Sequence, residues 1–162
     1  MNPADVTAAD LVAFVAHEAR CLDERRWDEW NALFAPEGWY WLPACPDATD
    51  PLAQASHLYD DALLREVRVR RLQSPVAHSQ QPAGRCHHLL QASEVLLCDP
   101  DANRFELRTP FIYTELRAGH TVTLPGVAWH QLRVHDGGLR LVLKRVDLLH
   151  ADQPLPAVEF YI

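Results

Sequence analysis

The segment TVTLPGVAWHQLRVHDGGLRLVLKRVDLL, residues 121–149, is dominated by β-branched, leucine and aromatic side chains on both sides of Asp136-Gly137-Gly138. Glycine readily adopts the positive φ angles that a tight hairpin turn requires. The segment therefore predicts two long antiparallel strands, at about 121–135 and 139–149, joined by a short turn.

Two further strands are expected upstream of this hairpin, at about 87–98 and 104–116. Asp99-Pro100-Asp101 has the composition of a turn between them, and Ala118-Gly119 forms the turn before residue 121. Successive strands joined by short turns pair as an antiparallel meander, and strands of this length curl because sheets twist.

The N-terminal part of the chain has a helical pattern. Thr7 and Asp10 resemble a capping box that begins a helix near residue 8. Apolar residues then recur at helical spacing, namely Leu11, Phe14, Val15, Ala19 and Leu22. A second short helix is expected to place four apolar residues on one face, before a short strand at 39–42: Trp27, Trp30, Leu33 and Phe34.

A third helix is expected at 61–72, where Leu63, Leu64 and Val67 would face the core and arginines would surround them. Residues 43–55 and 74–84 contain prolines and little periodicity, so loops are expected there. No internal repeat or low-complexity segment interrupts this order of elements.

Helices followed by a run of strands indicate the α+β class. We expect a curved antiparallel sheet wrapped around the N-terminal helices, which gives a cone-shaped barrel with a pocket between sheet and helices. Residues 1–162 are expected to form a single domain, with helices within about 8–34 and 61–72 and the main strands within about 87–149.

Composition excludes several classes of function. The formal net charge of -7 disfavours a nucleic-acid partner, because phosphate would be repelled. No apolar run reaches the roughly 20 residues of a membrane helix. The first ten residues lack a basic region followed by an apolar one, so we expect no signal peptide and a cytoplasmic location.

Metal motifs are incomplete despite nine histidines. Cys86-His87-His88 contains half of a Rieske signature, but Cys98 is not followed by the required histidine. His150 and Asp152 match half of a facial iron triad, with no second histidine downstream. The cysteines are scattered and are expected to be reduced thiols. We therefore expect no catalytic, cofactor-binding or metal-binding residues in this chain.

One alternative is a stand-alone isomerase or dehydratase of the same cone fold, using a pocket acid or base. The candidates for that role are Asp60, His88, Glu106 and Tyr40. A ligand-binding or scaffold module without an enzyme partner is a third hypothesis.

Several blocks of sequence resemble one known family, the small (beta) subunits of aromatic-ring-hydroxylating dioxygenases. Together they cover nearly the whole chain in the family's order: residues 18–30, 33–34, 40–43, 58–61, 66–72, 79–82, Arg85, His88, 144–146, 148–149 and 154–156. One departure lies at Gln91-Ala92-Ser93, where the family tends to carry an asparagine.

The resemblance implies a fold similar to nuclear transport factor 2 and ketosteroid isomerase, and a non-catalytic structural role. Such subunits form trimers and assemble with a large alpha subunit, typically three of each. The alpha subunit would hold a Rieske 2Fe-2S cluster and a mononuclear iron, with NADH as the electron source through a reductase. The holoenzyme would convert an aromatic compound to a cis-dihydrodiol. The short N-terminal segment makes a benzoate-like acid the first candidate substrate.

A subunit of this kind needs a surface for its partner. Loops 43–57 and 73–85 are candidate contact segments, because loops on a rigid scaffold often carry recognition. The candidate anchoring residues are Trp27, Trp30, Arg68, Arg70 and Arg85. The open alternatives are a packing role for the tryptophans and a solvated helix face for the arginines.

Overall fold

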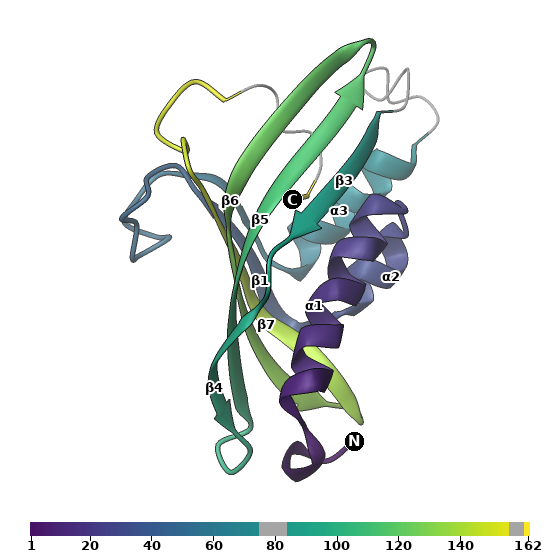
Figure 1. Cartoon of the computed structure of the whole chain (residues 1–162), viewed down its shortest axis with the longest axis vertical. Coiled ribbons are helices and arrows are strands. Elements are labelled where there is room, and N and C mark those ends of the chain that lie inside the picture. Colours follow the sequence, from purple (N-terminus) through teal and green to yellow (C-terminus); the bar gives the residue numbers. More distant parts are fainter. Residues whose placement is uncertain (75–83, 156–160) are drawn as a thin grey trace.

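Within the described residues of the computed structural model, seven strands form one strongly twisted sheet, and three α-helices lie against one of its faces (Figure 1). The structure describes residues 1–74, 84–155 and 161–162. The sheet order is β2-β1-β7-β6-β5-β3, with β4 also paired to β5. The strands are β1 Phe34–Pro43, β2 Ser56–Asp60, β3 Arg85–Leu90, β4 Glu94–Asp99, β5 Arg104–Arg117, β6 His120–His135 and β7 Gly138–Leu148.

The predicted α+β class and antiparallel meander are confirmed. β5, β6 and β7 pair in sequence through two-residue turns, with Arg117 opposite His120 and His135 opposite Gly138. Both residues of the second turn have positive φ, 48° at Asp136 and 73° at Gly137. This geometry follows the right-handed twist of the flanking strands, which explains why the hairpin could be recognised from local sequence.

The strand predicted at 87–98 is wrong in one respect, because it is two strands separated by residues 91–93. Both β3 and β4 pair with β5, and the break lies opposite Pro110. The Gln91 amide donates to the Pro110 carbonyl at 2.9 Å, but proline has no N–H with which to return the bond. The ladder therefore stops there and resumes at Glu94.

The strand predicted at 39–42 is longer in the structure, where it forms β1 at Phe34–Pro43, and β2 is not predicted from the sequence. The second helix, α2 (Trp27–Ala32), ends before Phe34, which begins β1 instead. The Leu141 amide of β7 donates to the Leu33 carbonyl at 2.8 Å, so the chain pairs with β7 directly after α2 ends. β1 runs parallel to β7, and β2 adds to its other edge in antiparallel order.

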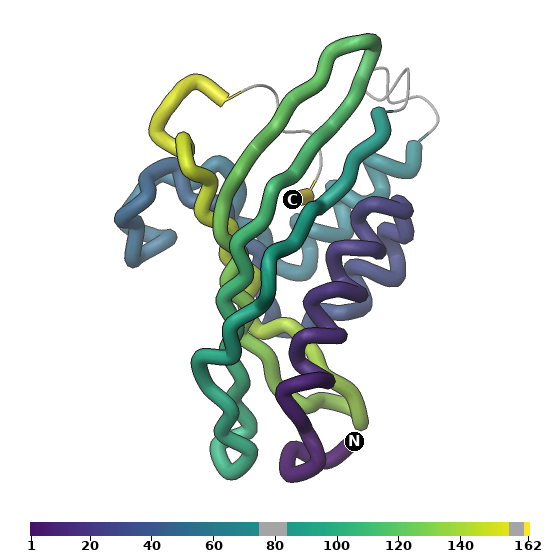
Figure 2. The backbone as a smooth tube through the Cα atoms, viewed as in Figure 1, coloured from purple at the N-terminus to yellow at the C-terminus, as the bar shows by residue number. Residues whose placement is uncertain are grey.

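Helix α1 (Ala8–Asp23) carries the predicted capping box between Thr7 and Asp10. Its buried face belongs to one hydrophobic cluster with the inner residues of β5 and β6, including Leu11, Val15, Phe105 and Leu132. Residues 161–162 lie in the space between the sheet and the helices (Figure 2), and both side chains are buried. Side chains of the helices, of the sheet and of residues 161–162 therefore fill the interior of the cone.

Helix α3 (Ala62–Gln73) lies within one residue of its predicted bounds at each end, but its predicted orientation is wrong. Leu63, Leu64 and Val67 are 66%, 44% and 55% exposed, whereas Arg65 is only 2% exposed. The buried Arg65 guanidinium donates to the Gly38 carbonyl and, through Nε, to Asn31 Oδ1 at 3.2 Å. These acceptors lie around the turn from α2 into β1, so they satisfy a charge that helical periodicity alone would place outside.

The loop predicted at 43–55 joins β1 to β2, and only its first residue, Pro43, lies in a strand; residues 56–57 of the candidate contact loop belong to β2. Most of the second predicted loop, the 79–82 block of the resemblance and Pro156 lie outside the described residues. No described helix is long and apolar enough to cross a membrane.

Candidate functional site

A buried ionic cluster occupies the interior of the cone. Lys144 of β7 donates from Nζ to both carboxylate oxygens of Glu18 on α1, at 2.7 and 2.9 Å. The Trp30 indole N–H donates to the same carboxylate. His130 of β6 completes the group, with Nε2 3.7 Å from Glu18 Oε2, which is beyond hydrogen-bond distance. All four residues are at most 2% exposed.

These contacts set the protonation states of the cluster. Burial alone would raise the pKa of Glu18, but the Lys144 ammonium and His130 outweigh it, so the pKa is lowered and the group is a carboxylate. Burial lowers the pKa of His130, so its ring is neutral at neutral pH. The cluster is therefore a buried ion pair beside a neutral imidazole.

A second polar cluster joins β2, α3 and the buried residues 161–162. Asp60 accepts a hydrogen bond from the Tyr161 hydroxyl at 2.9 Å and pairs with Arg68 Nε at 2.6 Å. The Tyr40 hydroxyl donates to the Ile162 carbonyl oxygen at 3.0 Å. The Tyr161 ring stacks on Trp30 with centroids 4.3 Å apart. These contacts tie residues 161–162 into the interior.

His88 of β3 is bound to the end of α1. Its backbone N–H and ring Nδ1 both contact the Asp23 carboxylate, the latter at 2.7 Å. Burial opposes ionisation of Asp23, but these hydrogen bonds outweigh it and lower its pKa. His88 Nε2 has no hydrogen-bond partner among the described residues. The ring lies beside Phe111 and Tyr113 on the inner face of the sheet.

The cavity between α1 and the sheet is small. Its volume is about 10 Å³, and its polar lining consists of Glu18, His88, Thr109, His130 and Lys144. That is about the volume needed for a single water molecule. An organic substrate does not fit in this cavity.

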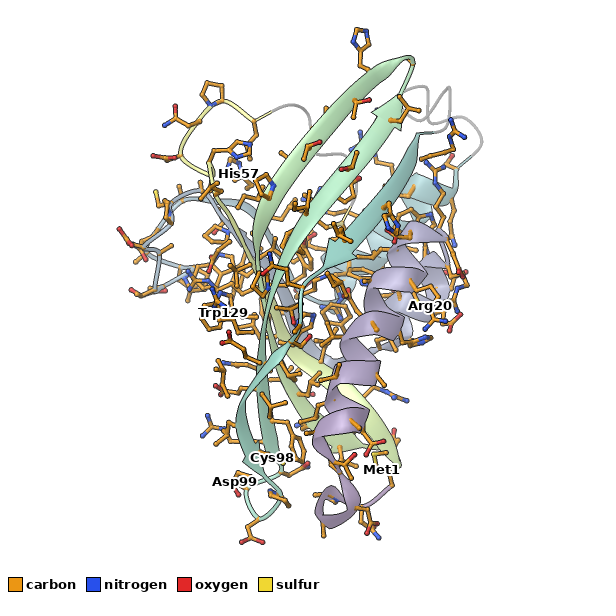
Figure 3. All side chains as sticks on the ribbon, viewed as in Figure 1. Met1, Arg20, His57, Cys98, Asp99 and Trp129 are labelled. Carbon is orange, nitrogen blue, oxygen red and sulfur yellow. The ribbon has the colours of Figure 1, made fainter. Side chains whose placement is uncertain are left out.

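The four acid–base candidates are not brought together. His88 lines the small cavity, whereas Asp60 and Tyr40 are bound in the second cluster. Glu106 lies on the other face of β5, beside Arg104 at 3.1 Å. Trp129 marks that outer face of the sheet in Figure 3, away from the helices, and donates to Asp147 at 2.8 Å. The described residues thus present no convergent acid–base site.

The model of a protein family described as the ring hydroxylating beta subunit matches residues 17–152, most of this chain. The chain belongs to this beta-subunit family. It is 31% identical over 159 residues to the small subunit of 2-halobenzoate 1,2-dioxygenase from Burkholderia cepacia, covering 93% of this chain and 95% of that subunit.

Solved structures show the beta-subunit fold as well. The chain matches the beta subunit of benzoate 1,2-dioxygenase from Burkholderia mallei with a TM-score of 0.77 and 21% identity, over 96% of this chain and 98% of that one. An NTF2-like protein with a cystatin-like fold from Novosphingobium aromaticivorans matches with a TM-score of 0.60 and 13% identity, over 87% and 80%. The expected resemblance in fold to nuclear transport factor 2 is therefore confirmed.

The interface candidates of this beta-subunit chain fall into two groups. Trp27 and Trp30 are 6% and 0% exposed, so their indoles pack within the chain, which is the alternative that the sequence left open. Arg68, Arg70 and Arg85 reach the surface, Arg68 while paired to Asp60 and Arg70 while paired to Glu66. Their role in contacts between subunits stays a prediction.

Sequence reasoning missed the ionic cluster. Glu18 continues the apolar spacing of Leu11, Val15 and Leu22 on α1, and a carboxylate on that face was a usable indication of a buried partner. The fold also gathers His17, Cys21 and Glu29, whose ligand atoms all lie within 4.8 Å of one another. The spacing of His17 and Cys21 places them on one helical face, but Glu29 comes from the next helix.

Acidification is expected to destabilise the fold in two stages. In the unfolded chain His130 takes up a proton near pH 6.5, whereas burial lowers its pKa in the folded protein. Because the unfolded state then binds more protons, the free energy of unfolding should fall as the pH drops below about 6.5. Because the folded-state pKa values of Glu18 and Asp23 are lowered, their stabilisation should be lost as the pH falls further below about 4.5 and 3.8. Urea unfolding at a series of pH values measures this, and equal stability at pH 7 and pH 4 would contradict it. The His130→Gln variant should lose the earlier stage and keep the later one.

Proposed function

We propose that this chain is the non-catalytic structural beta subunit of an aromatic-ring-hydroxylating dioxygenase, which converts an aromatic compound to a cis-dihydrodiol in aromatic catabolism. The observation that carries the proposal is the family match over residues 17–152, together with a cone interior filled by its own side chains. Under this proposal the chain acts in the cytoplasm, as a scaffold for a catalytic partner.

The packed interior also argues against the stand-alone isomerase or dehydratase. An acid or base acts only within hydrogen-bond reach of a bound substrate. Glu18 is bound by Lys144 and Trp30, and the cavity beside it has a volume of about 10 Å³. Asp60 is bound by Tyr161 and Arg68. A substrate would have to displace these contacts before any proton could be transferred.

The partner in this proposal is the large alpha subunit, with three copies of each subunit in the assembly. Beta subunits of such dioxygenases pair with alpha subunits, and in this proposal the alpha subunit carries the Rieske 2Fe-2S cluster and the mononuclear iron. NADH supplies electrons through a reductase. The similarity to a 2-halobenzoate 1,2-dioxygenase small subunit supports an aromatic acid of the benzoate type as the substrate.

The outer face of α3 is the contact surface that we propose for the alpha subunit. Leu63, Leu64 and Val67 form an exposed apolar strip there, and Arg70 extends it by one turn with a 75% exposed side chain. An apolar centre with arginine at its edge has the composition of a protein interface. Arg68 lies on the same helix, so two of the predicted anchors adjoin this α3 strip.

The outer face of the sheet carries a second apolar surface. A groove of about 450 Å³ is lined mainly by apolar residues of β5, β6 and the chain at the end of β7 and just after it, including Pro110, Ile112, Pro125, Val127 and Leu149. Asp147 at its edge already accepts hydrogen bonds from Trp129 and Arg145. We assign this groove to contacts between copies of the beta subunit, which would leave α3 free for the alpha subunit.

Co-expression with the large subunit of the same enzyme tests the proposal. We expect the two chains to co-elute on sizing with the mass of three of each, all iron to belong to the large subunit, and the assembly to oxidise benzoate. The chain purified alone should elute as a trimer. Separate elution of the two chains, with turnover of a small ketone or alcohol by this chain alone, would favour the isomerase or dehydratase.

A further inference from the structure

The junction between α1 and α2 brings three potential metal ligands together. His17 and Cys21 are one turn apart on α1, and the chain reverses at Arg25, which has a φ of 56°. That reversal places Glu29 of α2 beside them. His17 Nε2 lies 3.7 Å from Cys21 Sγ and 3.3 Å from Glu29 Oε1.

The two separations from His17 suit a single small metal ion, and all three ligand atoms lie within 4.8 Å of one another. Zinc binds imidazole nitrogen and carboxylate oxygen at roughly 2.0–2.2 Å and thiolate sulfur at roughly 2.3 Å, so neighbouring ligands of a tetrahedral site lie about 3.3–3.7 Å apart. A thiolate, an imidazole and a carboxylate together favour a borderline-soft ion over Mg²⁺ or Ca²⁺. We propose that His17, Cys21 and Glu29 form a binding site for Zn²⁺ or a similar divalent ion, with a fourth position open to solvent.

The surroundings of the three side chains agree with this site. Arg26 contacts Glu29 Oε2, which leaves Oε1 directed toward His17. A thiolate and a carboxylate carry two negative charges, so the loaded site would be neutral beside the Arg26 guanidinium. The Cys21 residue is 0% exposed, whereas the His17 and Glu29 side chains are 38% and 46% exposed, so an ion can enter from the side of these two.

Burial keeps the thiol protonated without metal, since it raises the pKa of Cys21 to about 11. A bound ion would displace that proton, as metals do at thiol ligands. The ion would join α1 to α2 at the point where the chain turns, and would stabilise the helical layer. This inference does not depend on the proposed dioxygenase function.

Cobalt substitution gives the sharpest test. The full chain, freed of metal with a chelator, is titrated with Co²⁺ and then with Zn²⁺ as competitor. We expect one equivalent of Co²⁺ to produce a sulfur-to-cobalt charge-transfer absorption, which Zn²⁺ removes. The His17→Gln variant, changed at a partly exposed position, should bind more than about 100-fold more weakly while keeping its circular dichroism spectrum.

Cysteine variants identify the sulfur. Cys21→Ser should abolish the charge-transfer absorption, whereas Cys98→Ser should keep it, because Cys98 is exposed on β4 and lies far from Arg20 of α1 in Figure 3. If Cys21→Ser does not fold, the His17→Gln and Glu29→Gln variants decide the question. The site is ruled out if the wild-type chain shows no such absorption, if the absorption survives in Cys21→Ser, or if His17→Gln binds as tightly as the wild type.

Discussion

Replacing Lys144 with methionine is expected to lower the free energy of unfolding at pH 7 by about 3–5 kcal/mol. The change removes the ammonium that neutralises Glu18 and leaves a carboxylate that is 1% exposed. Glu18 could instead become neutral by binding a proton, but for a carboxyl group with an ordinary pKa protonation costs about 3.7 kcal/mol at pH 7. Urea unfolding followed by circular dichroism measures the loss.

Two comparisons separate this electrostatic cause from simple loss of packing. In the Glu18→Gln and Lys144→Met double variant both charges are absent, and the amide can still accept from Trp30, so most of the stability should return. The single variant should also lose less relative to wild type at pH 5, where protonating Glu18 costs only about 1 kcal/mol. A Lys144→Met loss below about 1 kcal/mol at pH 7, or a double variant as weak as the single one, would contradict this account.

The same cluster is a feature that the sequence alone does not predict, whereas the hairpin turns are predicted. The turns at Ala118-Gly119 and Asp136-Gly137 are encoded by adjacent residues, and the meander follows from them. Glu18 and Lys144 are 126 residues apart, so nothing local pairs them. A register shift between Gln131 and Leu132, opposite β7, also changes which residues of β7 face inward. Leu141 and Lys144 are both buried as a result, against strict alternation.

The predicted orientation of helix α3 is wrong for a related reason. An arginine is normally placed outside, and a leucine inside, when only helical spacing is considered. Arg65 lies inside because the Gly38 carbonyl and Asn31 amide oxygen accept its hydrogen bonds and the Phe34 ring lies 3.9 Å from its guanidinium carbon. These acceptors come from α2 and β1, so the orientation of α3 depends on tertiary contacts. The consequence for function is that the apolar residues of α3 face outward.

Placing a carboxylate on this α3 strip, as Val67→Glu, is expected to weaken association with the alpha subunit at least about 100-fold. Burying an unpaired charge in an interface costs about 3 kcal/mol or more, and each 1.4 kcal/mol changes the dissociation constant about tenfold. The free chain should stay within about 0.5 kcal/mol of wild-type stability, because Val67 is 55% exposed and lies outside the hydrophobic core cluster of the described residues. Sizing of the co-expressed subunits, with iron and oxygenase activity measured on the pooled complex, gives the result.

Leu96→Glu is the matched control, since Leu96 is 50% exposed on β4, at the far end of the molecule from α3 in Figure 1. It introduces the same charge and should leave assembly unchanged. Arg70→Ala removes an exposed side chain already paired with Glu66, so it should weaken association without abolishing it. If Val67→Glu and Leu96→Glu assemble equally well, α3 is not the contact surface. The exposed strip would then be an ordinary apolar face, and the sheet groove would become the candidate for the alpha subunit.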